Sequence, residues 1–150
     1  MLTRLLLVSV LQVLVSLPVH ACKPLPWTYE SGAKSSAEYA RNLMKHATAI
    51  VLANVVSVDR IEHAHGASIT AEVRVIERFK GPADIRQIHS IGFGSCEART
   101  YAEDEQRLFV LLSHPGDRRL YEVFAWESPR FPEKELLIEL RKLKQSKAAG

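Results

Sequence analysis

The valine-rich run from Thr48 to Val58 constrains the fold of this chain most. It is almost wholly apolar, and Asn54 is its main interruption. A β-branched run of this length is typical of a strand that is buried on both faces. We therefore expect this segment to be an enclosed strand in a β-rich domain.

Further segments predict additional strands. Ile69 to Val75 alternates apolar and polar residues, which is the period of a strand with one wet face, and the register shifts near Ile76 as a bulge would cause. A less regular candidate follows at 85–91, then a short buried strand at 108–112 and a further strand at 120–126. Turns are expected at 79–82 and 114–117, which contain Gly and Pro. Strands of this number in one small domain favour a barrel or a sandwich.

Two segments predict helices. Ser35 and Glu38 fit a capping box, and the helix that follows ends near His46 after about three turns. Beyond Pro132, leucines at positions 136, 140 and 143 mark one stripe of a C-terminal helix, which becomes basic at 141, 142 and 144. Basic residues at that end complement the helix dipole. We assign residues 129–150 to this helix and its tail.

The first twenty-one residues have the order of a cleavable secretory signal. Arg4 precedes an apolar run from Leu5 to Leu17, and Val19-His20-Ala21 precedes Cys22. The run is shorter than the roughly 20 apolar residues of a membrane span. Cleavage leaves about 129 residues, the usual size of one domain. We expect export to the periplasm or the extracellular space and no integral membrane span.

Cys22 and Cys96 are the only cysteines. Two cysteines in an exported chain favour a disulfide, because the compartment is oxidising. A loop of about 75 residues closed in this way is worth up to roughly 4.5 kcal/mol in the chain-entropy model. Two unpaired thiols, or a Cys22 that is lipidated after cleavage, are the alternatives, and His20 argues against lipidation because a small or aliphatic residue is usual there.

Several landmarks occur in a recognisable order: Ala21-Cys22, a helix, residues 49–56, Glu77-Arg78-Phe79-Lys80-Gly81-Pro82, and then Gly94-Ser95-Cys96. This order resembles the inhibitory domain of the tissue inhibitors of metalloproteinases and the wider netrin-like modules, especially short two-cysteine bacterial relatives. The resemblance covers roughly residues 21 to 126. It implies a five-stranded OB-fold barrel in a domain over residues 22–128. Together with the two helices predicted above, we expect a mainly β fold with a short N-terminal helix and a C-terminal helix.

The resemblance also implies a mode of action. In that family the first mature cysteine is disulfide-bonded to a later one, which corresponds to Cys22 and Cys96. The free amine and carbonyl of the first cysteine chelate the catalytic zinc of a metalloendopeptidase, and Lys23, Pro24 and Leu25 would then lie along the protease cleft. A bidentate donor of this kind displaces the catalytic water from the open zinc position.

Departures from the family leave a second reading open. Lys23 stands where a small hydroxyl residue is usual, Pro24 replaces a cysteine, and Glu97 replaces a glycine. The alternative is a periplasmic or extracellular protein-interaction or scaffold domain that shares the fold without inhibiting proteases.

Other chemistries have weak sequence support. His63 and His65 form an H-x-H pair without a spaced third ligand, and the acidic run 103–105 has no partner, so we expect no metal site, no cofactor and no enzyme. The whole chain carries 20 Lys and Arg against 17 Asp and Glu, so its small net charge does not favour nucleic-acid binding. We expect a monomer.

Overall fold

A computed structural model describes residues 27–28, 32–92, 98–123 and 126–148. The elements follow in the order α2 (Ser36–His46), β1 (Ala49–His63), β2 (Gly66–Lys80), β3 (Gln87–Ile91), β4 (Gln106–Leu112), β5 (Tyr121–Glu122) and α3 (Glu133–Ala148). The domain is thus mainly β with a helix before and after the strands, as the sequence predicts. None of the helices in these ranges is both long and apolar enough to cross a membrane.

Helix α2 begins at the predicted capping box. The Ser35 hydroxyl accepts a hydrogen bond from the Glu38 N–H at 3.2 Å, and the Glu38 carboxylate accepts one from the Lys34 N–H at 2.9 Å. The first bond satisfies a first-turn N–H that has no partner within the helix, and the second ties the Glu38 side chain to the residue before the N-cap. Tyr39 and Leu43 are fully buried on the inner side of the helix, and the helix ends at His46, as the sequence predicts.

The five strands form one sheet that closes on itself in the order β1-β2-β3-β5-β4. β1 pairs antiparallel with β2 over most of its length and with β4 over residues 49–54. β3 pairs antiparallel with β2 and parallel with β5, where His89 stands beside Tyr121. β5 closes the ring by pairing antiparallel with β4.

The closed sheet separates two apolar clusters. Val51 of β1 and Phe109 of β4 join a cluster that includes Ile69 and Ile88 of the other strands. The neighbouring residues on β1 and β4 point the other way, and Ile50 joins the cluster beneath the helices. Both faces of β1 are therefore covered over residues 49–55, which explains why this part of its sequence is apolar without alternation.

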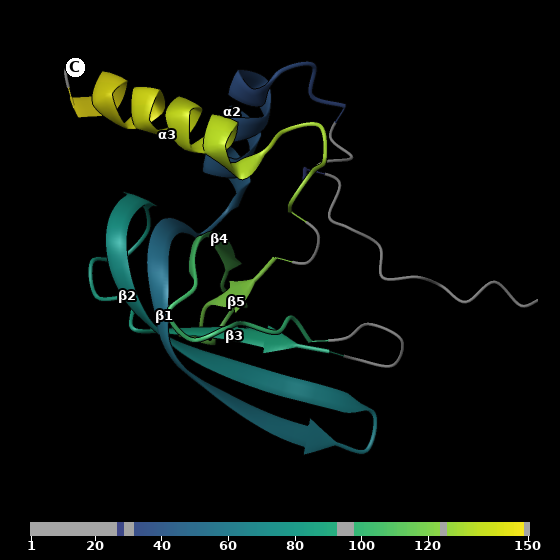
Figure 1. Cartoon of the computed structure of the whole chain (residues 1–150). Helices are drawn as coiled ribbons and strands as arrows, with labels where there is room; N and C mark the ends of the chain where they lie inside the picture. The colour runs from purple at the N-terminus through teal and green to yellow at the C-terminus, as the bar shows by residue number, and fades with distance from the viewer. Residues whose placement is uncertain (1–26, 29–31, 93–97, 124–125, 149–150) are drawn as a thin grey trace, which may run out of the picture.

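Helices α2 and α3 lie together on one side of the strands, as Figure 1 shows. Tyr39 of α2 and Leu136 and Leu140 of α3 pack in one cluster with Trp126, and all four side chains are fully buried. The Tyr39 hydroxyl donates a hydrogen bond to the carbonyl oxygen of Trp126. The α3 helix thereby covers a face of the sheet that would otherwise expose apolar side chains.

The β1–β2 hairpin is bulged near the helices and regular beyond them. Leu52 pairs with Glu77 and Ala53 pairs with Val75, so Ile76 is an extra residue on β2, which confirms the predicted register shift. The last shift lies between Val55 and Ser57. From there to the turn the hairpin is regular and extends away from the helices (Figure 1).

Two strands are shorter than the sequence predicts. Residues 85–91 and 120–126 were expected to be strands, whereas β3 begins at Gln87 and β5 covers only Tyr121 and Glu122. Ile85 and Leu120 are buried by packing against the closed sheet rather than by strand pairing. An apolar pattern reports burial, and burial alone does not distinguish a strand from a packed loop.

The turn after β2 depends on Gly81. This residue has a φ of +102°, and a Cβ placed on it would lie 2.5 Å from the Cβ of Ala49. A side chain at this position would therefore be strained and would clash with β1. The predicted turn at 79–82 is confirmed at this position, because β2 ends at Lys80.

Candidate functional site

The residues that the family resemblance singles out lie outside the described residues. These are Cys22, Lys23, Pro24, Leu25 and Cys96. The nearest described residues on the N-terminal side are Trp27 and Thr28. Trp27 stacks on His46 of α2 with ring centroids 5.5 Å apart, and Thr28 is fully buried. The chain is therefore held against the domain close to the predicted N-terminus.

The H-x-H pair lies at the tip of the β1–β2 hairpin. His63 ends β1, and its Nε2 lies 2.8 Å from the Ser68 hydroxyl oxygen, while His65 is exposed in the turn. Within the residues that the structure describes, no three His, Cys, Asp or Glu side chains are grouped to hold a metal ion. The pair by itself therefore does not make a metal centre.

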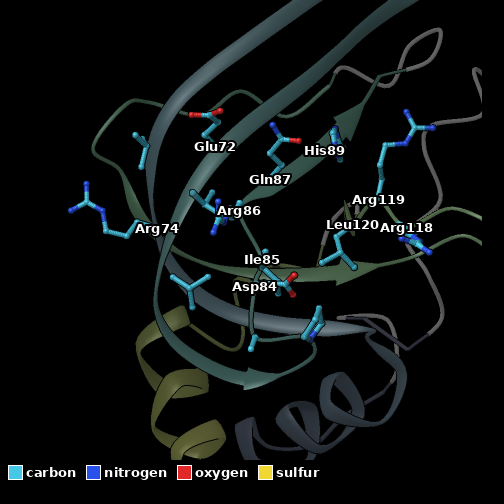
Figure 2. A pocket seen from close by; sticks show the side chains of 15 residues that line it. Glu72, Arg74, Asp84, Ile85, Arg86, Gln87, His89, Arg118, Arg119 and Leu120 are labelled. Carbon is cyan, nitrogen blue, oxygen red and sulfur yellow. The ribbon is translucent and has the colours of Figure 1, made fainter.

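A cavity of about 1180 Å³ forms a groove on the side of the closed sheet. It lies between β2, the 82–86 connection, β3 and residues 118–120 of the connection between β4 and β5. We call it the arginine groove, because its lining includes Arg74, Arg86, Arg118 and Arg119. In Figure 2, Arg74 lies at one end of the labelled side chains and Arg118 and Arg119 at the other, with Arg86 between them.

The floor of the arginine groove is apolar. Val73, Ile85 and Leu120 line it and are each less than a tenth exposed. Val73 points inward because β2 alternates buried and exposed residues, and this places Glu72 and Arg74 on the outer face. The strand pattern thus sets charged groups around an apolar surface.

Three arginines of the groove lack a partner among the described residues. Arg74, Arg86 and Arg118 are exposed and make no hydrogen bond or ion pair with any described side chain. Arg119 differs, because its guanidinium contacts the Asp117 carboxylate at 2.9 Å. Hydrogen bonds from Arg119 lower the pKa of Asp117 well below its usual range. The groove therefore holds guanidinium groups that are available to a ligand.

His89 adds a titratable group to the groove. Its Nδ1 lies 3.0 Å from the Thr70 hydroxyl oxygen, and its ring packs near that of Tyr121. Burial, followed by the charge of Arg119, lowers the pKa of His89. The imidazole is therefore neutral at pH 7 and gains charge only in acid.

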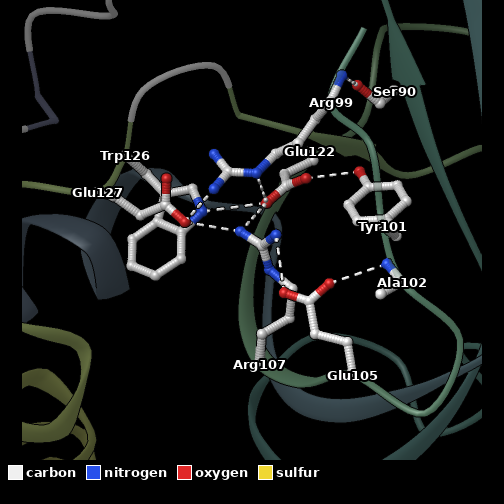
Figure 3. Close-up of polar contacts among 9 residues, drawn as sticks. All are labelled: Ser90, Arg99, Tyr101, Ala102, Glu105, Arg107, Glu122, Trp126 and Glu127. Carbon is white, nitrogen blue, oxygen red and sulfur yellow. Dashed lines mark hydrogen bonds and ion pairs between the residues drawn. The ribbon is translucent and has the colours of Figure 1, made fainter.

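A second feature is a cluster of charged side chains between β4, β5 and the 98–101 segment (Figure 3). The Arg107 Nη2 lies 3.3 Å from Glu122 Oε1 and 2.6 Å from Glu127 Oε1. Arg99 pairs with the same two carboxylates. The side chains of Arg107 and Glu122 are only 8% and 2% exposed. Arg107 also contacts Glu105 Oε1 at 3.6 Å, so the cluster joins two cations to three anions around the buried Arg107 and Glu122 side chains.

Hydrogen bonds complete the network around Glu122. The Tyr101 hydroxyl donates to Glu122 Oε2 at 2.5 Å, and the Trp126 indole donates to Oε1 at 3.2 Å. Burial raises the pKa of Glu122, and the Arg107 guanidinium opposes that shift. A cavity of about 410 Å³ adjoins the cluster. Because the charges already pair with one another, we regard this network as structural.

The sequence did not identify the arginine groove or the charge cluster. Arg74 stands on the polar face of an alternating strand, where an exposed charge is ordinary. Arg118 and Arg119 follow the predicted turn 114–117, and nothing in the sequence shows that this turn reaches the same surface as β2. The only available signal was the excess of arginine in these segments.

Among the described residues, two hydroxyl groups lie within hydrogen-bond distance of an imidazole: that of Ser68 lies 2.8 Å from His63, and that of Thr70 lies 3.0 Å from His89. No protein-family model matches this chain, and no curated protein matches it either.

Proposed function

We propose that this chain is an exported OB-fold module that binds a partner protein by taking an acidic segment into the arginine groove. The strand order β1-β2-β3-β5-β4 and the parallel contact of β3 with β5 support the OB assignment. OB barrels bind their ligands on the face of strands 2 and 3 and on the loop between strands 4 and 5. The arginine groove has this position.

The observation that carries the proposal is the set of guanidinium groups at Arg74, Arg86 and Arg118, which have no partner among the described side chains. A guanidinium binds a carboxylate through two parallel hydrogen bonds, which gives geometric specificity as well as energy. Only Glu72 and Asp84 oppose these charges in the lining. A negatively charged ligand therefore matches the groove better than a neutral or basic one.

The lining also favours a polypeptide over a nucleic acid. Single-stranded nucleic acids bind OB folds by stacking bases on aromatic side chains. Among the described residues that line the arginine groove there is no Phe, Tyr or Trp, and the floor is aliphatic at Val73, Ile85 and Leu120. Such a floor suits the aliphatic side chains of an extended peptide that alternates acidic and apolar residues.

The experiment measures the binding of a fluorescein-labelled peptide of alternating glutamate and valine to the mature domain by fluorescence anisotropy. We expect binding that weakens as salt is added, because salt screens exposed charges. Arg86→Glu and Arg118→Glu should each weaken binding by about tenfold, since each replaces an attractive charge with a repulsive one. Arg41→Glu, an exposed change on α2, is the matched control and should leave the affinity unchanged.

Two results would contradict the proposal. One is equal binding of a peptide with lysine in place of glutamate, which would show that the arginines do not select charge. The other is tighter binding of a labelled oligothymidine than of the acidic peptide, together with the same loss in the arginine variants. That outcome would assign the groove to nucleic acid.

A second candidate function is inhibition of a zinc metalloendopeptidase through the amine and carbonyl of Cys22. The observation that favours it is the anchoring of Trp27 and Thr28 on the domain, since residues so near the mature N-terminus are held by packing. A held N-terminus loses less conformational entropy when it enters a cleft. Lys23, Pro24 and Leu25 would then follow the cleft.

This second candidate is tested with two forms of the protein, one beginning at Cys22 and one carrying an extra residue before it. Both are titrated against a panel of zinc endopeptidases. Chelation requires the free amine of Cys22, so only the first form should inhibit. Equal inhibition by both forms, or none by either, would rule out this mechanism without affecting the arginine groove.

A further inference from the structure

The outer edge of β1 is unpaired over the part of the hairpin that extends from the closed sheet. On this edge β1 pairs with β4 only as far as Asn54, which stands opposite Gln106. Val55 makes the last bonds, donating to the Glu105 carbonyl and accepting from the Asp104 N–H, each at 2.9 Å. Residues 56–63, here called the hairpin edge, have no neighbouring strand on that side within the described chain.

The hairpin edge is regular and accessible. Residues 57–63 pair with β2 in continuous register, and residues 59–63 are exposed. Ile61 is 53% exposed, one of the most exposed large apolar side chains of the described chain. Every second residue of an edge strand directs its N–H and C=O outward, where they can pair with another strand. The edge carries no proline or bulge beyond Ser57 that would prevent such pairing.

The sequence of the hairpin edge is complementary to itself. When two identical antiparallel strands pair about a two-fold axis, opposite residues lie on the same face and differ by an even number of positions. If Ile61 of one copy faces Ile61 of the other, Arg60 stands opposite Glu62 and Asp59 stands opposite His63, each twice. Arg60 also pairs with Glu62 of its own strand, so in such a dimer each of these guanidinium groups would lie beside two carboxylates. Opposite charges and apolar pairs at such positions stabilise a sheet.

Neighbouring registers place like charges opposite each other. Centring the pair on Arg60, on Asp59 or on Glu62 sets each of these side chains against its own copy. Like charges that are directly opposite destabilise a strand pair. Charge therefore selects the register centred on Ile61 from among the adjacent ones.

We propose that this protein forms a two-fold dimer in which the hairpin edges of two copies pair antiparallel, centred on Ile61. The two closed sheets then lie at opposite ends of the paired hairpins, because each hairpin extends away from its own helices (Figure 1). This proposed dimer differs from the monomer that we expect from the sequence alone. A contact limited to one strand pair is small, so we expect a dissociation constant on the order of 10 μM.

Sedimentation equilibrium of the mature protein over about 1–200 μM tests the proposal, a range that brackets the expected constant. Arg60→Glu sets a glutamate at position 60 against Glu62 of the second copy, and Glu62→Arg sets two arginines together, so each variant alone should dimerise at least tenfold more weakly. Mixing the two variants restores opposite charges at every one of these positions. The mixture should therefore form a heterodimer with close to the wild-type affinity.

A second measurement tests the register. The variant Ile61→Cys should give a covalent dimer under oxidising conditions, because opposite positions in an antiparallel pair lie close enough for a disulfide. Ile138→Cys, at a comparably exposed isoleucine of α3, should stay monomeric on a non-reducing gel. A wild-type protein that remains monomeric throughout the range would overturn the proposal. So would a mixture of the two charge variants that associates no better than either one alone.

Discussion

Replacing Arg107 with methionine should lower the free energy of unfolding by about 3–5 kcal/mol, because it leaves the buried Glu122 carboxylate without its closest cation at that position. Glu122 is 2% exposed and lies 3.3 Å from the Arg107 guanidinium. The substitution also removes a cation that packs over the rings of Tyr101 and Phe109. Urea denaturation monitored by circular dichroism measures the loss of free energy of unfolding.

Two variants separate the charge from the loss of packing at Arg107. In the double variant Arg107→Met/Glu122→Gln the amide no longer needs a cation, its oxygen can accept from the Trp126 indole, and its NH2 can donate to the Tyr101 hydroxyl oxygen, so at least half of the lost stability should return. Arg119→Met breaks an exposed pair with Asp117 and should cost less than about 1 kcal/mol. An equal loss in the single and double variants would show that the buried charge is not the cause.

Replacing Trp126 with alanine should lower the free energy of unfolding by about 3–5 kcal/mol, the usual cost of deleting a fully buried large aromatic ring. Trp126 is fully buried where α2 and α3 meet the sheet, and its indole N–H donates to Glu122. The cavity would open between Tyr39, Leu136 and the strands. Thermal or urea unfolding checks this value.

Trp27 is the matched control for Trp126. It packs at the margin of the same apolar cluster and is only half-buried, so Trp27→Ala should cost less than half as much. If the two substitutions lower the free energy of unfolding equally, the packing of Trp126 between the helices and the sheet does not contribute the stability that we expect.

Much of the architecture follows from local sequence patterns. Three predicted features are confirmed: the helix start at Ser35, the strand with one solvent-exposed face through Glu72 and Arg74, and the leucine stripe of α3. These features depend on contacts between residues that are close in sequence, and periodicity reports such contacts directly. The apolar run at 48–58 is confirmed as part of a strand. This strand continues to His63, because residues 57–63 pair with β2 although they do not pack in the core.

Features that depend on the closed topology could not be predicted. The arginine groove gathers Arg74, Arg86 and Arg118 from segments that meet only when β2, β3 and β5 come together in one ring. The charge cluster likewise joins Arg107 to Glu122, and its members look like ordinary surface charges in the sequence. The free edge of β1 becomes apparent only when the end of its pairing with β4 is known.

The central claim is that an acidic peptide binds in the arginine groove, and the most direct test is chemical-shift mapping. The ¹⁵N-labelled mature domain is titrated with the peptide of alternating glutamate and valine, and amide shifts are followed by NMR. We predict that the largest shifts fall at residues 72–75, 84–87 and 118–120, which line the groove. Shifts confined to α2, α3 or the hairpin edge, or no shifts at saturating peptide, would contradict the claim.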